Sequence, residues 1–155
     1  MLLASLLLPA LGACSPGAVD LPEVNATGLV EQTCRRFLDD LPDTLADQPR
    51  REVSPEDALG VAWGDPAIVV TCGGPPPDDF GPTSSCTTVN GVDWYVPDEE
   101  IAEPGDEQGT VTIHSVKRDV TVAVELPGDY WPPATALADL SGTVADDIPA
   151  TSRCR

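Results

Sequence analysis

The sequence TVTIHSV at residues 110–116, followed by KRD and then by VTVAVEL at residues 120–126, contains two runs in which apolar residues recur at alternate positions. Successive side chains of a β-strand point to opposite faces, so the apolar residues at alternate positions from Val120 to Leu126 share one face. A short polar break between two such runs is typical of a β-hairpin. The stretch therefore predicts two antiparallel strands with one buried face.

Two further segments upstream carry strand signals. AIVVTC at residues 67–72 is apolar and rich in β-branched residues, which is typical of a buried strand. Residues 87–89 and 92–96 flank Asn90-Gly91, and Asn-Gly is a strong hairpin signal because both residues tolerate positive φ. These segments predict one more buried strand and a second hairpin.

Three segments carry helix signals. From Leu29 to Leu41 apolar residues recur at helical spacing, and Pro42 then ends the pattern. From Ala134 to Ile148 four aliphatic residues fall on one side of a second predicted helix. Residues 54–57, Ser-Pro-Glu-Asp, have the cap, the first-turn proline and the acids that open a short helical turn.

These elements together predict the α+β class: a small antiparallel sheet with helices packed on one face, cross-linked by disulfides. The polar segment that contains Arg50 and Arg51 is expected to be a loop, and Pro97 to Gly109 an acidic loop. A chain of 155 residues is enough for one domain with a real core.

The charge of the chain excludes one class of partner. It has 26 acids against 8 bases, a formal net charge of −18. Binding nucleic acid needs a cationic surface that releases counterions from phosphates, so nucleic acid is not expected as a partner. Anionic lipid head groups would also repel the chain, so attachment to a membrane would need a covalent lipid. The acids are expected mainly to keep the protein soluble.

The N-terminus reads as a lipoprotein leader. Residues 2–8 are almost wholly apolar, and Pro9-Ala-Leu-Gly-Ala13 then leads to Cys14, whose thiol is the nucleophile for a diacylglyceryl group. Two acyl chains anchor a protein stably. We therefore expect residues 1–13 to be a signal peptide, 14–28 a lipidated cysteine with its tether, and 29–155 one extracytoplasmic domain. No Lys or Arg precedes Cys14, so a longer signal or an uncleaved anchor helix is the alternative.

Four cysteines remain after Cys14, and an even number in an exported chain predicts a disulfide framework. Three pairings are possible. We favour Cys72 with Cys86, because the Gly- and Pro-rich segment between them can bring its ends together, and hence Cys34 with Cys154. A zinc site is disfavoured because the chain has no C-x-x-C pair and a single histidine.

The polar residues offer only weak catalytic or metal-binding candidates. His114 is expected on the more polar face of its strand, where a lone histidine is usually structural. The adjacent acids Asp78 and Asp79, beside Phe80, are poorly placed to act on one substrate atom. The acids of residues 98–107 lack the D-x-D-x-D-G spacing of a calcium loop. We therefore expect no catalytic residue, no metal and no cofactor.

The large aromatic residues are the better candidates for binding, since such residues dominate interaction hot spots. Trp63 and Trp94 are expected in the core. Tyr130 and Trp131 precede Pro132-Pro133, and we interpret them as a possible partner-binding pair. The alternative is that they staple the sheet to the last helix.

Several blocks of the sequence resemble a known family. They are CRRFLDDLP from Cys34, AWGDPAIVVTCG from Ala62, NGVDW from Asn90 and VAVELPGDY from Val122, together with the near-terminal Cys154. In these the chain resembles the domain of unknown function 3515 family of actinobacterial envelope proteins. The resemblance implies an exported or membrane-anchored location, and it implies no established activity or catalytic residues.

We therefore expect a lipid-anchored protein on the outer face of the cytoplasmic membrane. On these features we expect it to act as a non-catalytic binding or assembly domain for an envelope protein or a cell-wall component. The alternative is an envelope hydrolase that uses paired carboxylates, which requires two acids facing each other across a cleft.

Overall fold

A computed structural model describes residues 17–103 and 105–154. Its centre is an eight-stranded sheet in the order β2-β3-β5-β6-β10-β9-β8-β7, and every neighbouring pair is antiparallel. The strands of this sheet are β2 Thr44–Leu45, β3 Gln48–Arg51, β5 Gly60–Trp63, β6 Ile68–Gly74, β7 Thr87–Val89, β8 Val92–Tyr95, β9 Val111–Val116 and β10 Thr121–Leu126.

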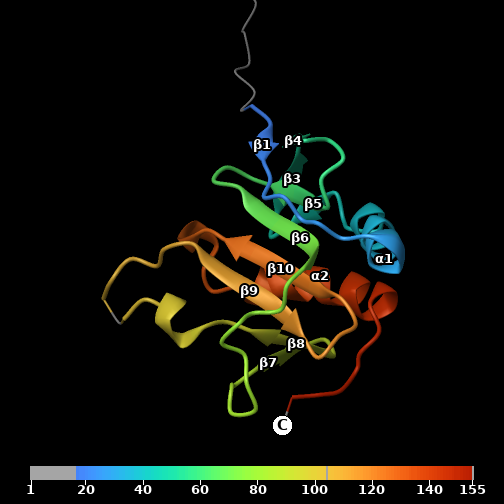
Figure 1. The fold of residues 1–155 in the computed structure, drawn as a ribbon. Helices are drawn as coiled ribbons and strands as arrows, with labels where there is room; N and C mark the ends of the chain where they lie inside the picture. Colours follow the sequence, from blue (N-terminus) through green and yellow to red (C-terminus); the bar gives the residue numbers. More distant parts are fainter. Residues whose placement is uncertain (1–16, 104, 155) are drawn as a thin grey trace, which may run out of the picture.

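Two helices pack on one face of this sheet: α1 Gly28–Asp39 and α2 Ala134–Asp147. Phe37 of α1 and Leu140 of α2 are fully buried, and both belong to one core cluster with sheet residues such as Val122. Figure 1 shows α2 behind β10 and α1 at the side of β6. The predicted α+β class, with helices on one face of an antiparallel sheet, is confirmed.

The opposite face of the sheet is partly covered by a second, smaller layer. β1 Val19–Asp20 pairs in parallel with β4 Val53–Ser54. Beside them Leu21 packs on Ala62 and Val69, which point away from the helices. The segment predicted as a tether, residues 14–28, is therefore in part packed on the domain. Residues 1–16, including Cys14 and the predicted signal peptide, lie outside the described residues.

The strongest local signals correspond to the observed elements. β9 and β10 form the hairpin predicted at residues 110–126, and Val122 and Val124 are fully buried on its inner face. β7 and β8 form the second hairpin, in which Asn90 and Gly91 both have positive φ. The two long helices begin and end within two residues of their predicted bounds.

Residues 43–63 differ from the prediction. Arg50 and Arg51 lie in strand β3 rather than in a loop, and Ser54 to Asp57 form a strand end and a turn rather than a helical turn. The guanidinium of Arg50 donates to the backbone carbonyls of Leu38 and Leu41, while its cation lies 5.6 Å from the ring centroid of Trp63. These contacts stabilise a strand that carries two positive charges and shows no alternation of apolar and polar residues.

The disulfide pairing also differs from the prediction. Cys34 of α1 is bonded to Cys72 of β6, and Cys86 to Cys154. Three strands separate β6 from β7, which begins directly after Cys86. Four strand spacings amount to about 19 Å, whereas the Cα atoms of a disulfide lie within about 7 Å. The loop after Cys72 therefore carries Cys86 across the sheet to the C-terminal segment.

Candidate functional site

A pocket of about 330 Å³ lies at the end of the sheet where the C-terminal segment meets the β9–β10 turn. Three segments distant in sequence form it: the loop from Phe80 to Ser84, the turn residue Lys117, and the tail from Ser152 to Cys154. The Cys86–Cys154 disulfide joins the first segment to the third. We call this pocket the basic notch, because Lys117 and Arg153 line it.

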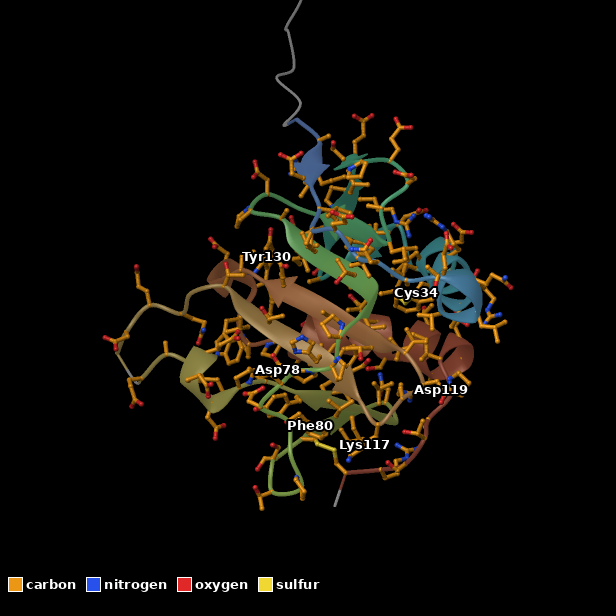
Figure 2. The ribbon with its side chains drawn as sticks, in the orientation of Figure 1. Cys34, Asp78, Phe80, Lys117, Asp119 and Tyr130 are labelled. Carbon is orange, nitrogen blue, oxygen red and sulfur yellow. A yellow bond between two sulfur atoms is a disulfide. The ribbon has the colours of Figure 1, made fainter. Side chains whose placement is uncertain are left out.

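Lys117 is the only lysine of the chain, and the fold holds it at a defined place. Its φ is +60°, in the left-handed region that costs a non-glycine residue roughly 1 kcal/mol. Its carbonyl accepts a 2.8 Å hydrogen bond from the N–H of Thr151. The Nζ atom lies 5.0 Å from the ring centroid of Phe80, a cation–π contact. Figure 2 shows these two side chains beside each other.

Arg153, which lines the notch, meets a second arginine, Arg118, at the carbonyl of Gly91. Arg153 and Arg118 both donate to the carbonyl of Gly91, at 2.7 and 3.2 Å. Arg118 also donates to the carbonyls of Val144 and Ile148 at the end of α2, where a cation is favourable to the helix dipole. Burial lowers the pKa of Arg118, and the nearby charge of Arg153 acts in the same direction.

Asp93 is the buried acid beneath these arginines. One of its oxygens accepts a 2.6 Å hydrogen bond from the hydroxyl of Thr88, and the other a 2.9 Å bond from the N–H of Cys154. Burial would raise the pKa of this carboxyl, but the two hydrogen bonds and the charges of Arg153 and Arg118 together hold the pKa below its usual value. Asp93 therefore stays ionised and holds the C-terminal tail on the hairpin.

The two cations that line the notch have no acidic partner. The ion pairs among residues 17–103 and 105–154 involve Arg35 with Glu31 and Arg36 with Asp147, and no carboxylate of these described residues lies within ion-pair distance of Lys117 or Arg153. In a chain with 26 acids and 8 bases this is unexpected. The notch is therefore a local concentration of available positive charge on an acidic protein.

A larger pocket, of about 430 Å³, lies between α1 and the strands β3 to β5. Arg35, Arg50 and Arg51 line it, but each guanidinium already donates to backbone carbonyls. Three acids line the same pocket: Asp39, Glu52 and Glu56. Its positive charges are therefore held by the fold and balanced by acids, unlike those of the notch.

The polar candidates from the sequence gather on the sheet face away from the helices. Tyr95 of β8 donates a 2.6 Å hydrogen bond to Asp79, and this bond, together with burial and the charges of Asp79 and Glu99, raises the pKa of Tyr95 to about 12. His114 pairs with Tyr95 across the strands. Burial lowers the pKa of His114 against the opposing effect of Glu100 and Asp79.

His114 is half-buried, and its lowered pKa favours the neutral imidazole. Its Nδ1 atom is buried and has no hydrogen-bond partner among the described residues. Asp79 is engaged by the phenol of Tyr95, and Asp78 beside it is exposed. Glu100, from the acidic segment, accepts a 2.6 Å bond from the N–H of Thr112. Among the described residues no group of three potential metal ligands is close enough to hold an ion.

The aromatic residues singled out in the sequence fall into two groups, one buried and one half-buried. Trp63 and Trp94 are buried in the core, and their indole N–H groups donate to Pro42 and Ser141. Tyr130 and Trp131 are half-buried and pack against the core. The phenol of Tyr130 donates a 2.8 Å bond to the carbonyl of Pro66, so this residue joins the segment before α2 to the β5–β6 turn.

The basic notch was not apparent from the sequence. The sequence places Lys117 in a hairpin turn, and nothing in it indicates that Ser152 and Arg153 lie beside this turn. A signal was present, because the last third of the acidic chain holds four of its eight basic residues, among them Lys117 and Arg153. Their convergence depends on the strand order and on the Cys86–Cys154 bond.

The comparisons with known proteins agree with the sequence blocks. No helix among the described residues has the length and apolar character needed to cross a membrane. No curated protein and no solved structure matches the chain. One family model matches residues 1–153, and its description is "Protein of unknown function (DUF3515)". Because this match extends over almost the whole chain, the protein belongs to the DUF3515 family.

Proposed function

We propose that the protein is a lipid-anchored, non-catalytic binding domain of the cell envelope. The observation that supports this proposal is the distribution of the five cysteines between disulfides and the N-terminal segment. Two disulfides consume the four cysteines of the domain, and Cys14, after its apolar leader, is the fifth. Disulfides persist in oxidising compartments outside the cytoplasm. A single remaining thiol directly after a small-residue sequence is the group that lipidation requires.

The basic notch supports a binding role at a defined place. It is concave and lies between three segments that a disulfide and several hydrogen bonds hold together. Preorganised polar groups lose little entropy when a ligand binds. Lys117 and Arg153 offer charges that no acid of the described residues neutralises.

The contacts of the titratable groups favour binding over catalysis. The disulfides remove the four body cysteines as nucleophiles. Asp79 accepts a hydrogen bond from Tyr95, and the Nδ1 atom of His114 is enclosed. The acids of the larger pocket, which a hydrolase could use, lie among arginines.

The anchor is tested with the full chain expressed in a bacterium that processes lipoproteins. Wild type is expected to incorporate labelled palmitate, to sediment with membranes and to be cleaved by protease added to intact protoplasts. Cys14→Ala is expected to carry no label and to leave the membrane fraction. Ser15→Ala is the matched control, because it changes the neighbouring residue without removing the thiol.

One result would contradict the proposal. If Cys14→Ala still sediments with membranes as wild type does, another anchor holds the protein and the lipid assignment is wrong.

A further inference from the structure

We infer that the basic notch binds a phosphate group. This inference rests on the proposed binding function and adds to it the chemistry of the ligand. Its basis is the convergence of Lys117, Arg153 and two serine hydroxyls on one pocket of a strongly acidic protein.

The donors of the notch surround the space from different sides. The ammonium of Lys117 comes from the β9–β10 turn, and the guanidinium of Arg153 and the hydroxyl of Ser152 come from the tail. The loop contributes the hydroxyl of Ser84, which also donates a long 3.5 Å bond to the carbonyl of Asp79. A tetrahedral phosphate accepts hydrogen bonds in several directions, whereas a carboxylate presents two oxygens in one plane. Donors on three segments therefore fit phosphate better than carboxylate.

Most donors of the two cations are available. Lys117 makes a cation–π contact with Phe80, which positions the ammonium and leaves its N–H groups free of any acceptor among the described residues. Arg153 uses one nitrogen to bind Gly91, and its other nitrogens have no acceptor in the described part of the chain. The hydrogen bond to Gly91 therefore positions the guanidinium and leaves its other N–H groups available to a ligand.

The acids next to the notch make no ion pair with these cations. Asp93 accepts hydrogen bonds from Thr88 and from the N–H of Cys154, and its charge also interacts with those of Arg153 and of the half-buried Arg118. Asp79 is bound by Tyr95. Both carboxylates still lower the local positive potential, and the chain as a whole carries −18. Affinity for a single phosphate is therefore expected to be modest and to fall steeply as salt is added.

The negative charge of the chain also indicates which kind of molecule carries the phosphate. A planar anionic membrane brings many negative charges against the whole acidic surface, whereas one phosphate of a soluble or polymeric ligand enters the notch alone. We therefore expect the phosphate to come from a soluble or polymeric ligand rather than from a lipid head group.

The test is a titration of the full chain, isotope-labelled and purified from membranes in detergent with its disulfides intact. Inorganic phosphate is added at low ionic strength, and the backbone amide signals are followed by NMR. Saturable shifts are expected at Ser84, Lys117 and Ser152, and acetate is expected to bind at least several-fold more weakly. Lys117→Gln and Arg153→Gln are each expected to weaken phosphate binding about tenfold.

Three controls separate a specific site from general electrostatics. Lys117→Arg keeps the charge and should retain most of the binding. Arg35→Gln removes the same charge from α1 and should leave phosphate affinity unchanged within about twofold. Vesicles of phosphatidylglycerol should shift the notch signals no more than vesicles of phosphatidylcholine.

The inference is overturned if phosphate shifts no notch signal, or if Arg35→Gln and Lys117→Gln weaken binding equally. Shifts of the notch with phosphatidylglycerol alone would likewise overturn the choice of a non-lipid phosphate. Either failure leaves the lipid on Cys14 untouched, because that is measured by palmitate incorporation. Loss of the lipid, conversely, would leave phosphate binding intact.

Discussion

The phenol of Tyr95 donates a 2.6 Å hydrogen bond to the carboxylate of Asp79, across sixteen residues of sequence. The ring of Phe80 meets that of Tyr95 edge to face, with centroids 5.1 Å apart. These two contacts hold the β6–β7 loop against the open face of the sheet. The same loop supplies Phe80 and Ser84 to the basic notch, so Tyr95 positions one wall of that pocket.

The first prediction concerns the ionisation of Tyr95. In a Tyr130→Phe background Tyr95 is the only tyrosine, so its ionisation can be followed by ultraviolet absorbance. The midpoint is expected at about pH 12, because the bond to Asp79 favours the neutral phenol. Asp79→Asn should lower the midpoint toward the ordinary value near 10. An unchanged midpoint in Asp79→Asn would show that burial, rather than this bond, controls the ionisation.

The second prediction concerns stability below neutral pH. His114 is the only histidine, and burial lowers its pKa, so the unfolded chain binds more protons than the folded one just below pH 6.5. The free energy of unfolding should therefore rise from pH 5.5 to pH 7, with a slope of a fraction of one proton. Urea denaturation at several pH values measures it. His114→Asn should flatten the slope of the unfolding free energy against pH. If the variant has the same slope as wild type, the pH dependence comes from carboxyl groups and not from His114.

The third prediction separates the two disulfides. Cys34 and Cys72 are fully buried, whereas Cys86 and Cys154 are half-buried at the edge of the notch. A thiolate must reach a disulfide sulfur to reduce it. Mild reductant under native conditions is therefore expected to open only Cys86–Cys154, as mapped by alkylation and mass spectrometry.

Two further measurements complete this test. Unfolding the protein in urea before reduction should expose both bonds to alkylation. The prediction is wrong if Cys34 and Cys72 are labelled under native conditions as fast as Cys86 and Cys154. In the chain-entropy model each bond, closing loops of 38 and 68 residues, stabilises the protein by roughly 4 kcal/mol.

The elements predicted correctly are those with a local cause. Asn90-Gly91 imposes its turn through backbone conformation, and the alternation from Val120 to Leu126 survives in the observed strand because one face is buried. Strand β3 has no such signal. Gln48–Arg51 is a strand because distant carbonyls accept from Arg50 and Arg51, and no pattern within the segment announces those partners.

The disulfides and the notch required the strand order, which is not local. Cys72 and Cys86 are close in sequence, yet β10, β9 and β8 lie between the strands that carry them. Lys117 and Arg153 line one pocket because a tail residue, Thr151, binds the turn. The sequence singles out Tyr130 as an aromatic residue before the last helix, but its bond to Pro66 depends on where the β5–β6 turn lies.

The pairing of β1 with β4 determines how far the domain can stand from a lipid on Cys14. Val19 is fixed to the body by its N–H bond to the carbonyl of Glu52, and only four residues of sequence lie between it and Cys14. Even fully extended, such a segment spans at most about 18 Å. The basic notch lies at the end of the molecule opposite β1 (Figure 1). An anchored domain would thus be held close to the bilayer with its notch directed outward, toward the cell wall.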